Sequence, residues 1–583
     1  MRFLSLVATF CILAASLYLV SIYGLASYSE VERLGRIPYF EDVPDGLLFL
    51  SLPLTPGRFA VFQTFIWVLL IGSFSANVFL LKDNAYRLEL KYLGREFNKS
   101  LSALKRRVQR LSASERAVAG TLLLAILLTR LVWFIIDPLS PDETASYDYF
   151  VREGTVSVTS FYPIPNNHVL YNFICWVVSE LMPENVRVIM RLPSLLVATV
   201  GTALSYVLLM HFSNFRIATL VTALFSLVRL TIIYADSGRG YFLQMVCIQL
   251  SFFAVVGIVT RHPFRRLAWA MLIGSSIIGL YTIPTYAAPL ASLALVLLIA
   301  GMQLEPHFRH RFLGQLVLAG VIIAVTTIFC YTPVGIISGW SRLLANRYLA
   351  SHSLVTFLTG SKAYAYEAAS LVGPVQPTLL ICTALIIFTP VLLRRTQLKG
   401  CGQWMAWASW ILILTPAVIM LVQHVFMPGR VIMYTTYFVF LLAALWADQA
   451  LSQGGTTWTH RLPMAFLTAF IAFRIVELGT QVPTLLQSQK QDAIVAKAYH
   501  WLRSQPARRV FVQAPYHAVM FRHYAMLDNQ TMALYTKHVS GVHYAYLVCR
   551  NDQPLPPAWA AGLNYQAIYQ DEMAIIYQLK ATL

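Results

Sequence analysis

The chain has 583 residues, of which 57% are hydrophobic and 12% charged, and its formal net charge is +18. Soluble domains contain about 25% charged residues, so this composition excludes a soluble globular protein and indicates a polytopic membrane protein. The basic excess does not indicate nucleic-acid binding, because Lys and Arg gather in alternate loops, as they do where positive charge orients membrane helices. The seven cysteines show no paired spacing, so neither a disulfide framework nor a zinc site is expected.

Hydropathy predicts about thirteen transmembrane helices, each close to the roughly 20 apolar residues that a bilayer requires. The predicted spans are 3–23, 59–81, 117–136, 191–210, 215–233, 240–260, 267–283, 286–302, 312–331, 378–393, 404–422, 431–447 and 462–479. If each crosses once, the basic loops all fall on one side, which should be the cytoplasmic side. We therefore expect a multi-pass protein of a bacterial inner or plasma membrane, with a cytoplasmic N-terminus and an outer C-terminus. Residues 1–21 could also be a cleaved signal peptide, but their apolar run favours a retained anchor.

The sequence divides into three predicted parts. Residues 1–116 contain the first two spans and a basic cytoplasmic linker, and residues 117–480 form a helical membrane core. The core has two long outer segments, 137–190 and 332–377, and the glycines of the second make it a candidate mobile lid. Residues 481–583 mix helix and strand patterns and predict a small extracytoplasmic α/β domain. Its expected elements are strands at 509–513 and 545–549, a helix at 516–524 and a hairpin across 565–579.

An acidic pair, Asp142 and Glu143, follows the third predicted span on the outer side of the membrane. Two carboxylates at a fixed depth beside the bilayer suit an enzyme that deprotonates an acceptor and transfers a group from a lipid-borne donor. The structural alternative is that these acids stabilise the N-terminus of a helix over 144–153. Asp236 and Arg239, on the next outer loop, could join the same site or form a local ion pair.

Five strings carry a resemblance to a known family. They are Asp142-Glu143, 167–171 (Asn-His-Val-Leu-Tyr), 191–194 (Arg-Leu-Pro-Ser), 236–241 (Asp-Ser-Gly-Arg-Gly-Tyr) and Arg430. From about residue 117 onward the chain resembles the GT-C superfamily of membrane glycosyltransferases. It is most similar to the family 39 type, which includes the aminoarabinose transferase of lipid A and protein O-mannosyltransferases. It departs from that pattern at Val169 and Leu170, where the family often has prolines, and at Val431, where it usually has tyrosine.

The resemblance implies a polyprenyl-phosphate sugar donor, inversion at the anomeric carbon and transfer outside the cytoplasm. Asp142 is then expected to be the catalytic base, with Glu143 behind it and Asp236 converging on the same cavity. Cationic and polar groups should hold the departing phosphate and the substrate. The residues expected in that role are His168, Tyr171, Arg239, Tyr241, Lys362 and Arg430. Asp142, Glu143 and His168 could also hold a divalent cation.

Two other classes of protein remain open from the sequence. One is a secondary transporter or flippase for a lipid-linked or amphiphilic solute, although such proteins place ionisable groups near the membrane midplane and often have two related halves. The other is a non-catalytic relative that serves as a scaffold subunit. For an enzyme, the acceptor stays open among glycolipid, polysaccharide and protein, and the sugar is equally open.

Overall fold

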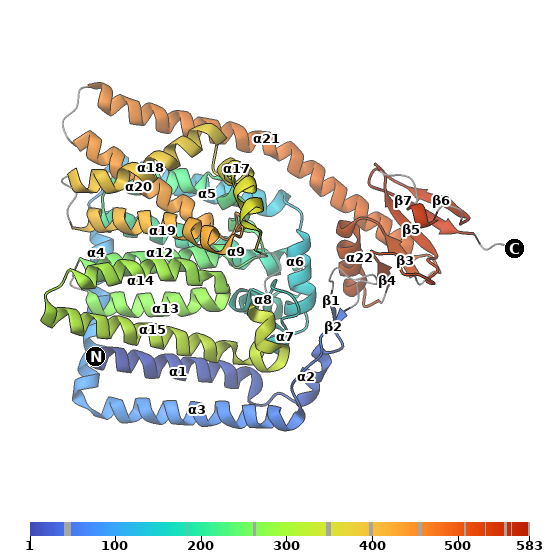
Figure 1. Cartoon of the computed structure of the whole chain (residues 1–583), viewed down its shortest axis with the longest axis horizontal. Helices are drawn as coiled ribbons and strands as arrows, with labels where there is room; N and C mark the ends of the chain where they lie inside the picture. The colour runs from blue at the N-terminus through green and yellow to red at the C-terminus, as the bar shows by residue number, and fades with distance from the viewer. Residues whose placement is uncertain are drawn as a thin grey trace.

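The computed structural model describes residues 1–39, 48–183, 185–260, 264–344, 351–395, 400–452, 457–506, 509–530, 532–552, 557–560 and 563–580. Within these ranges nine helices are long and apolar enough to cross a membrane. They pack side by side as one bundle, with the short helices α6 to α8 and the C-terminal strands beyond one end of it (Figure 1). The chain is therefore a multi-pass α-helical membrane protein, as its composition predicted.

The nine helices match nine of the predicted spans within a few residues. They are α1 (Arg2–Tyr23), α3 (Pro56–Lys82), α5 (Ala113–Ile136), α9 (Val186–Phe212), α12 (Tyr241–Val259), α14 (Ala287–Met302) with η2 (Pro284–Tyr286), α15 (Pro306–Val334), α18 (Val375–Arg395) and α19 (Cys401–Gln423). A predicted straight span at 215–233 is instead two helices, α10 (Phe215–Ser226) and α11 (Arg229–Asp236), bent by 75°. That bend brings Asp236 to the end of a short helix rather than into an outer loop.

The other three predicted spans are also helical, although they are not among the nine. They are α13 (Arg265–Thr282), α20 (Met433–Ser452) and α21 (Thr457–Arg503). Helix α13 packs on α12, and α20 packs on α19 and α10. Together these helices surround the largest cluster of buried apolar side chains, in which Phe252 and Phe253 are fully buried. Helix α21 continues far past residue 480, where the sequence suggested a domain boundary, and reaches the C-terminal strands (Figure 1).

The predicted basic linker forms one long helix, α4 (Asn84–Gln109), at the end of the bundle opposite α6 to α8. Its two acidic residues, Glu89 and Glu96, accept hydrogen bonds from Arg266 at the start of α13, at 2.6 Å and 3.3 Å. Near its C-terminus Arg107 donates to the carbonyl oxygen of Met210 in α9 at 2.9 Å. We call this end of the bundle, marked by α4 and the start of α13, the remote end.

The segment 332–377, which the sequence suggested as a mobile lid, is mostly helical where the structure describes it. After α15 come η3 (Gly335–Gly339), α16 (Trp340–Leu344) and α17 (Leu354–Ser370). Helix α17 begins with a side-chain cap, because Ser353 Oγ accepts the Thr356 N–H at 3.1 Å. The expectation of a mobile lid stays a prediction, and the structure adds that residues 354–370 of this segment form a helix.

The C-terminal residues form the predicted small α/β domain. Its sheet has the strand order β4-β3-β5-β7-β6, with β4, β3 and β5 parallel and β5, β7 and β6 antiparallel. The elements are β3 (Arg509–Val512), α22 (Pro515–Leu527), β4 (Ala533–Tyr535), β5 (Tyr546–Arg550), η5 (Ala558–Ala560), β6 (Tyr565–Gln570) and β7 (Ala574–Leu579). The expected hairpin is thus β6–β7, and β4 is the strand that the sequence did not reveal.

Short elements complete the fold at the end of the bundle that lies nearest the C-terminal domain (Figure 1). They are α2 (Tyr28–Leu34), β1 (Pro38–Tyr39), β2 (Leu48–Phe49), α6 (Pro141–Ser146), η1 (Tyr147–Val151), α7 (Thr155–Ser160) and α8 (Val169–Leu181). Helix α6 starts with a proline and a capping box, in which Ser140 N–H donates to Glu143 at 2.8 Å and Glu143 N–H donates to Ser140 Oγ at 3.3 Å. This local sequence fixes where α6 begins and therefore the direction in which the Asp142 side chain points.

Candidate active site

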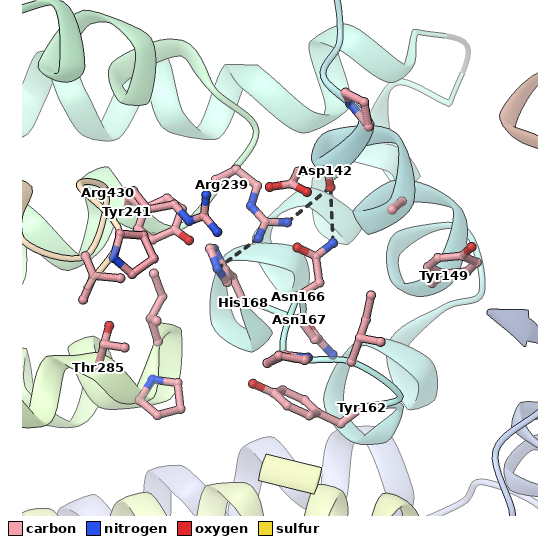
Figure 2. Close-up of a pocket in the computed structure, with 18 of the residues that line it drawn as sticks. Asp142, Tyr149, Tyr162, Asn166, Asn167, His168, Arg239, Tyr241, Thr285 and Arg430 are labelled. Atoms are coloured by element: carbon pink, nitrogen blue, oxygen red, sulfur yellow. Dashed lines mark hydrogen bonds between the residues drawn. The ribbon is translucent and has the colours of Figure 1, made fainter. Parts of the chain in front are cut away.

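A cavity of about 260 Å³ lies between the end of the bundle and the C-terminal domain. Its walls come from α6, the loop before α8, the turn between α11 and α12, the loop between α19 and α20, and α22. Figure 2 shows Asp142, His168, Arg239, Tyr241 and Arg430 pointing toward this space from different parts of the chain. The structure therefore brings five of the nine predicted site residues into one cavity.

Asp142 and Asp148 both line the cavity, and Asp142 is the one whose carboxylate has no hydrogen-bond partner among the described residues. It is the second residue of α6 and is exposed, so its side chain projects from the positive end of a helix dipole. Its backbone oxygen accepts hydrogen bonds from Arg239 Nη1 at 3.2 Å and from Asn166 Nδ2 at 3.5 Å (Figure 2). The carboxylate itself takes part in no hydrogen bond with the described residues, so it is available to a substrate.

Glu143 points the other way and does not line the cavity. It is 1% exposed, and Arg191 donates to both of its oxygens, each at 2.7 Å. Gly238 N–H donates to Oε1 at 2.6 Å. Burial alone would raise the pKa of Glu143, but Arg191 and the backbone donors hold that pKa below its ordinary value. Glu143 is therefore an ionised link between α6, α9 and the turn that carries Arg239.

The turn at Gly238 depends on this link. A Cβ atom at Gly238 would lie 2.8 Å from Met190 Cβ and 3.0 Å from Glu143 Oε1, so a larger residue could not approach α6 as closely. Arg239 follows directly, is 4% exposed, and donates from Nη1 to Ser146 Oγ at 2.6 Å. The guanidinium group is thus held at the cavity wall before any substrate arrives.

His168 forms the wall beside Arg239. Its Nδ1 accepts the Gly240 N–H at 2.9 Å, and its Nε2 lies 3.2 Å from Arg239 Nη2. Burial, together with the charges of Arg239 and Arg430, holds the pKa of His168 well below its usual range. The ring is therefore neutral at pH 7, and the positive charge of the cavity comes from arginine. Tyr241 packs edge-on against the imidazole, with the ring centroids 4.8 Å apart.

The other four predicted site residues lie outside the cavity lining. Asp236 is 1% exposed, and neither carboxylate oxygen has a hydrogen-bond partner among the described residues. Tyr171 is buried, donates to the Met190 carbonyl oxygen, and accepts from Ser194 Oγ at 2.8 Å, so it packs behind the site. Lys362 lies on α17 and is exposed, with Nζ 5.9 Å from the centroid of the Tyr366 ring. Glu143 is the fourth, as described above.

The C-terminal domain adds residues that the sequence did not indicate. Val519 and Arg522 of α22 line the cavity. The neighbouring His523 Nδ1 lies 2.9 Å from Asp148 Oδ1 of η1, and both side chains are almost fully buried. These two residues are 375 positions apart, so no local pattern could have linked them. A second bridge joins Arg152 Nη2 to Asn529 Oδ1 at 2.6 Å.

We expect His523→Ala to loosen the C-terminal domain from the bundle. The substitution removes the partner of the buried Asp148 carboxylate and should cost about 1–3 kcal/mol of the free energy that holds α22 against η1. Limited proteolysis should then cut the C-terminal domain faster than in the wild type. His543→Ala, which changes an exposed histidine of the same domain, is the matched control and should leave the cutting rate unchanged. Equal rates for both variants would contradict a structural role of the Asp148–His523 contact.

The predicted metal site is not assembled in the part of the chain that the structure describes. No group of three or more His, Cys, Asp or Glu side chains is close enough there to hold a metal ion. For the proposed trio of Asp142, Glu143 and His168 the reason is clear. The oxygens of Glu143 already accept hydrogen bonds from Arg191 and from backbone N–H groups, and His168 Nδ1 accepts from Gly240.

The overall fold has solved counterparts among membrane proteins, and these agree with the fold that the sequence resemblance implied. It is similar to ArnT from Cupriavidus metallidurans in the apo state, with a TM-score of 0.53 and 14% identity over 80% of this chain and 98% of that one. It is also similar to the same protein bound to undecaprenyl phosphate, with a TM-score of 0.50 and 14% identity over 81% and 99% of the two chains. No protein-family model and no curated protein matches the sequence.

Proposed function

We propose that the protein is an integral membrane glycosyltransferase that moves a sugar from a polyprenyl-phosphate donor to an extracytoplasmic acceptor. The observation that carries this proposal is the pairing of one available carboxylate, Asp142, with the guanidinium groups of Arg239 and Arg430 in one cavity. Such a site offers a base for the acceptor and cations for a leaving phosphate. A structural neighbour of the same fold was crystallised with undecaprenyl phosphate, which supports a donor of that chemical class.

In the proposed reaction the acceptor hydroxyl or amine attacks the anomeric carbon of the sugar. Asp142 takes the proton of the acceptor as the new bond forms. The bond between the anomeric carbon and the phosphate oxygen breaks, and polyprenyl phosphate leaves with its electron pair. Arg239 and Arg430 neutralise the charge that develops on this phosphate. Attack from the face opposite the leaving group inverts the anomeric centre.

Of the three predicted catalytic carboxylates, only Asp142 reaches the cavity, so the proposal gives the base to Asp142 alone. Glu143 acts as a positioning residue, because it holds the turn of Gly238 and Arg239 against α6. The neutral His168 holds that same turn through the Gly240 N–H. Asp236 has no direct role in the proposed chemistry, since its side chain is buried away from the cavity lining.

The proposed location of the reaction is outside the cytoplasm. The C-terminal domain and the short helices α6 to α8 lie at one end of the bundle, and the basic helix α4 lies at the other (Figure 1). Because residues of α6 and α22 line the cavity, it lies at the first of these ends. Positive charge marks the cytoplasmic side of membrane proteins, which supports an outward-facing cavity. A cavity at the end of the bundle also fits a transferase better than a transporter, whose binding site lies near the midplane.

A donor assay tests the proposal. The purified full chain in nanodiscs would be given polyprenyl-phosphate pentoses and hexoses, and release of free polyprenyl phosphate would be followed with cell-envelope glycolipid, polysaccharide or protein as acceptor. Release from at least one donor is expected. Neither binding nor release with any donor would contradict the proposal, and proton- or sodium-driven uptake into proteoliposomes would then favour the transporter.

Arg239→Gln and Arg430→Gln should each weaken binding of the polyprenyl-phosphate donor. A charge-assisted hydrogen bond contributes about 1.5–3 kcal/mol, so we expect KM for the donor to rise by about 10–100-fold. Lys362→Gln is the matched control, because it removes one positive charge from an exposed residue outside the cavity. A rise in KM for Lys362→Gln with no change for the two arginine variants would move the phosphate site to α17.

A further inference from the structure

A second cavity lies at the remote end of the bundle, on the opposite side of the molecule from the active site. Its volume is about 340 Å³, within the range of small-ligand sites. It is formed where α12 and α14 end and where α13 and α15 begin. Because three of these helices are candidate membrane spans, their ends place the cavity at the boundary between the apolar core of the bilayer and its headgroups.

The lining of this cavity is amphiphilic. Its floor is apolar and includes Ile258, Ala300 and Phe312, which are 1%, 8% and 5% exposed. Its rim carries two arginines from different helices, Arg265 of α13 and Arg311 of α15. No acidic side chain is found among the described residues that line it. The cavity therefore offers positive charge directly above an apolar surface.

Two acidic side chains of α4 near this end of the bundle pair with a neighbouring arginine. The adjacent Arg266 faces α4 instead, where it pairs with Glu89 at 2.6 Å and with Glu96 at 3.3 Å. These two acids of α4 are thus neutralised by Arg266 rather than by the rim arginines. Arg265 is held over the Phe312 ring, with Cζ 5.8 Å from the ring centroid, which places its guanidinium group above the apolar floor.

We propose that this cavity binds the phosphate headgroup of an anionic phospholipid. Basic pockets between transmembrane helices at the membrane surface are suited to lipid phosphates. The two arginines would contact the phosphate oxygens, and the glycerol and the upper part of an acyl chain would cover the apolar floor. Free inorganic phosphate could meet the arginines but would leave that floor exposed to water, so the lining favours a lipid. This inference is independent of the reaction at the other end of the bundle.

Snorkelling is the simpler explanation for arginine at a helix end, because the side chain reaches toward water without a ligand. It explains each arginine separately. It does not explain why residues of two helices meet over one cavity with a buried apolar floor. A ligand that needs both groups together predicts a loss of binding when they are removed, whereas snorkelling predicts only a general loss of surface charge.

Native mass spectrometry of the full chain in detergent tests the proposal. The protein would be titrated with phosphatidylglycerol, cardiolipin and phosphatidylcholine. We expect one anionic lipid to bind, and Arg265→Gln with Arg311→Gln to weaken its affinity by at least about tenfold. The matched control is Lys105→Gln with Arg106→Gln, which removes two charges from exposed residues of α4 at the same end and should not change the affinity.

Three results would overturn this proposal. The first is an equal loss of affinity in both double variants, which would show diffuse attraction to surface charge. The second is equal binding of phosphatidylcholine and the anionic lipids. The third is full displacement of the lipid by inorganic phosphate, which would show that the cavity selects a free anion. Thermal unfolding of the Arg265 and Arg311 variant should lie close to the wild type, because both side chains are exposed and a contact between a cation and an aromatic ring at an exposed site is weak.

Discussion

Asp142→Asn is expected to lower the rate of sugar transfer by about 10²–10⁴-fold, the usual contribution of a general base. Asparagine has the same shape as aspartate but cannot take the acceptor proton at neutral pH. The exposed carboxylate makes no hydrogen bond with the described residues, so its loss should not disturb α6. Release of polyprenyl phosphate in the presence of acceptor measures the effect, with donor binding followed separately.

The control for this prediction is Glu153→Gln, which removes a carboxylate from the same outer segment but outside the cavity lining. It should keep wild-type turnover. Asp142→Asn should also retain donor binding and an unchanged midpoint of thermal unfolding, since the arginines stay in place. Normal transfer by Asp142→Asn would exclude it as the base, and a loss of donor binding would instead assign it to substrate positioning.

Glu143→Gln is expected to have the largest effect on stability. It removes the closer of the two carboxylates that pair with the Arg191 guanidinium group, which is 1% exposed, and leaves only Asp137 at 3.5 Å. Breaking a buried ion pair from one side costs about 3–5 kcal/mol. The Gln side chain has only one acceptor oxygen for the donors of Arg191, Ser140 and Gly238, so the turn of Gly238 and Arg239 should be held more weakly and activity should fall. Chemical denaturation in mixed micelles measures the change, and the neighbouring Asp142→Asn serves as the control without a stability loss.

The same pair predicts how stability depends on pH. Because the pKa of Glu143 is lower in the folded protein than in the unfolded chain, its contribution is complete above the unfolded value of about 4.3. That contribution is lost as the pH falls through the lower, folded value. In Glu143→Gln this part of the acid-dependent loss should be missing. An unchanged acid profile in the variant would show that Glu143 is not ionised in the folded protein.

The membrane fold could be predicted because it depends on local composition. A run of apolar residues indicates a membrane helix wherever it occurs, and nine predicted spans agree with the structure. The sequence did not reveal helix α17, because the glycines at 335, 339, 360 and 373 drew attention to a candidate mobile lid. Only Gly360 lies inside that helix, and Ser353 caps its start, so local helix propensity outweighs one glycine.

Part of the site could also be predicted, because it depends on short local strings of the sequence. Asp142, His168 and Arg239 lie in short strings that already suggested outer loops, and these loops meet in the cavity. The sequence could not show which of the two adjacent acids, Asp142 or Glu143, faces the cavity. That choice depends on Arg191 of another helix, which pairs with Glu143. The His523 contact of Asp148 likewise depends on how the C-terminal domain docks, which hydropathy does not encode.

Helix α21 connects the helical bundle to the C-terminal domain as one continuous helix. It has 47 residues, so it is about 70 Å long, more than twice the roughly 30 Å thickness of the apolar core of a bilayer. Its outer part packs on α22, which carries Val519 and Arg522 at the cavity. A tilt of about 5° around one end of such a rigid helix would move its other end by about 6 Å. A displacement of α21 would therefore also displace the part of the cavity wall that α22 supplies.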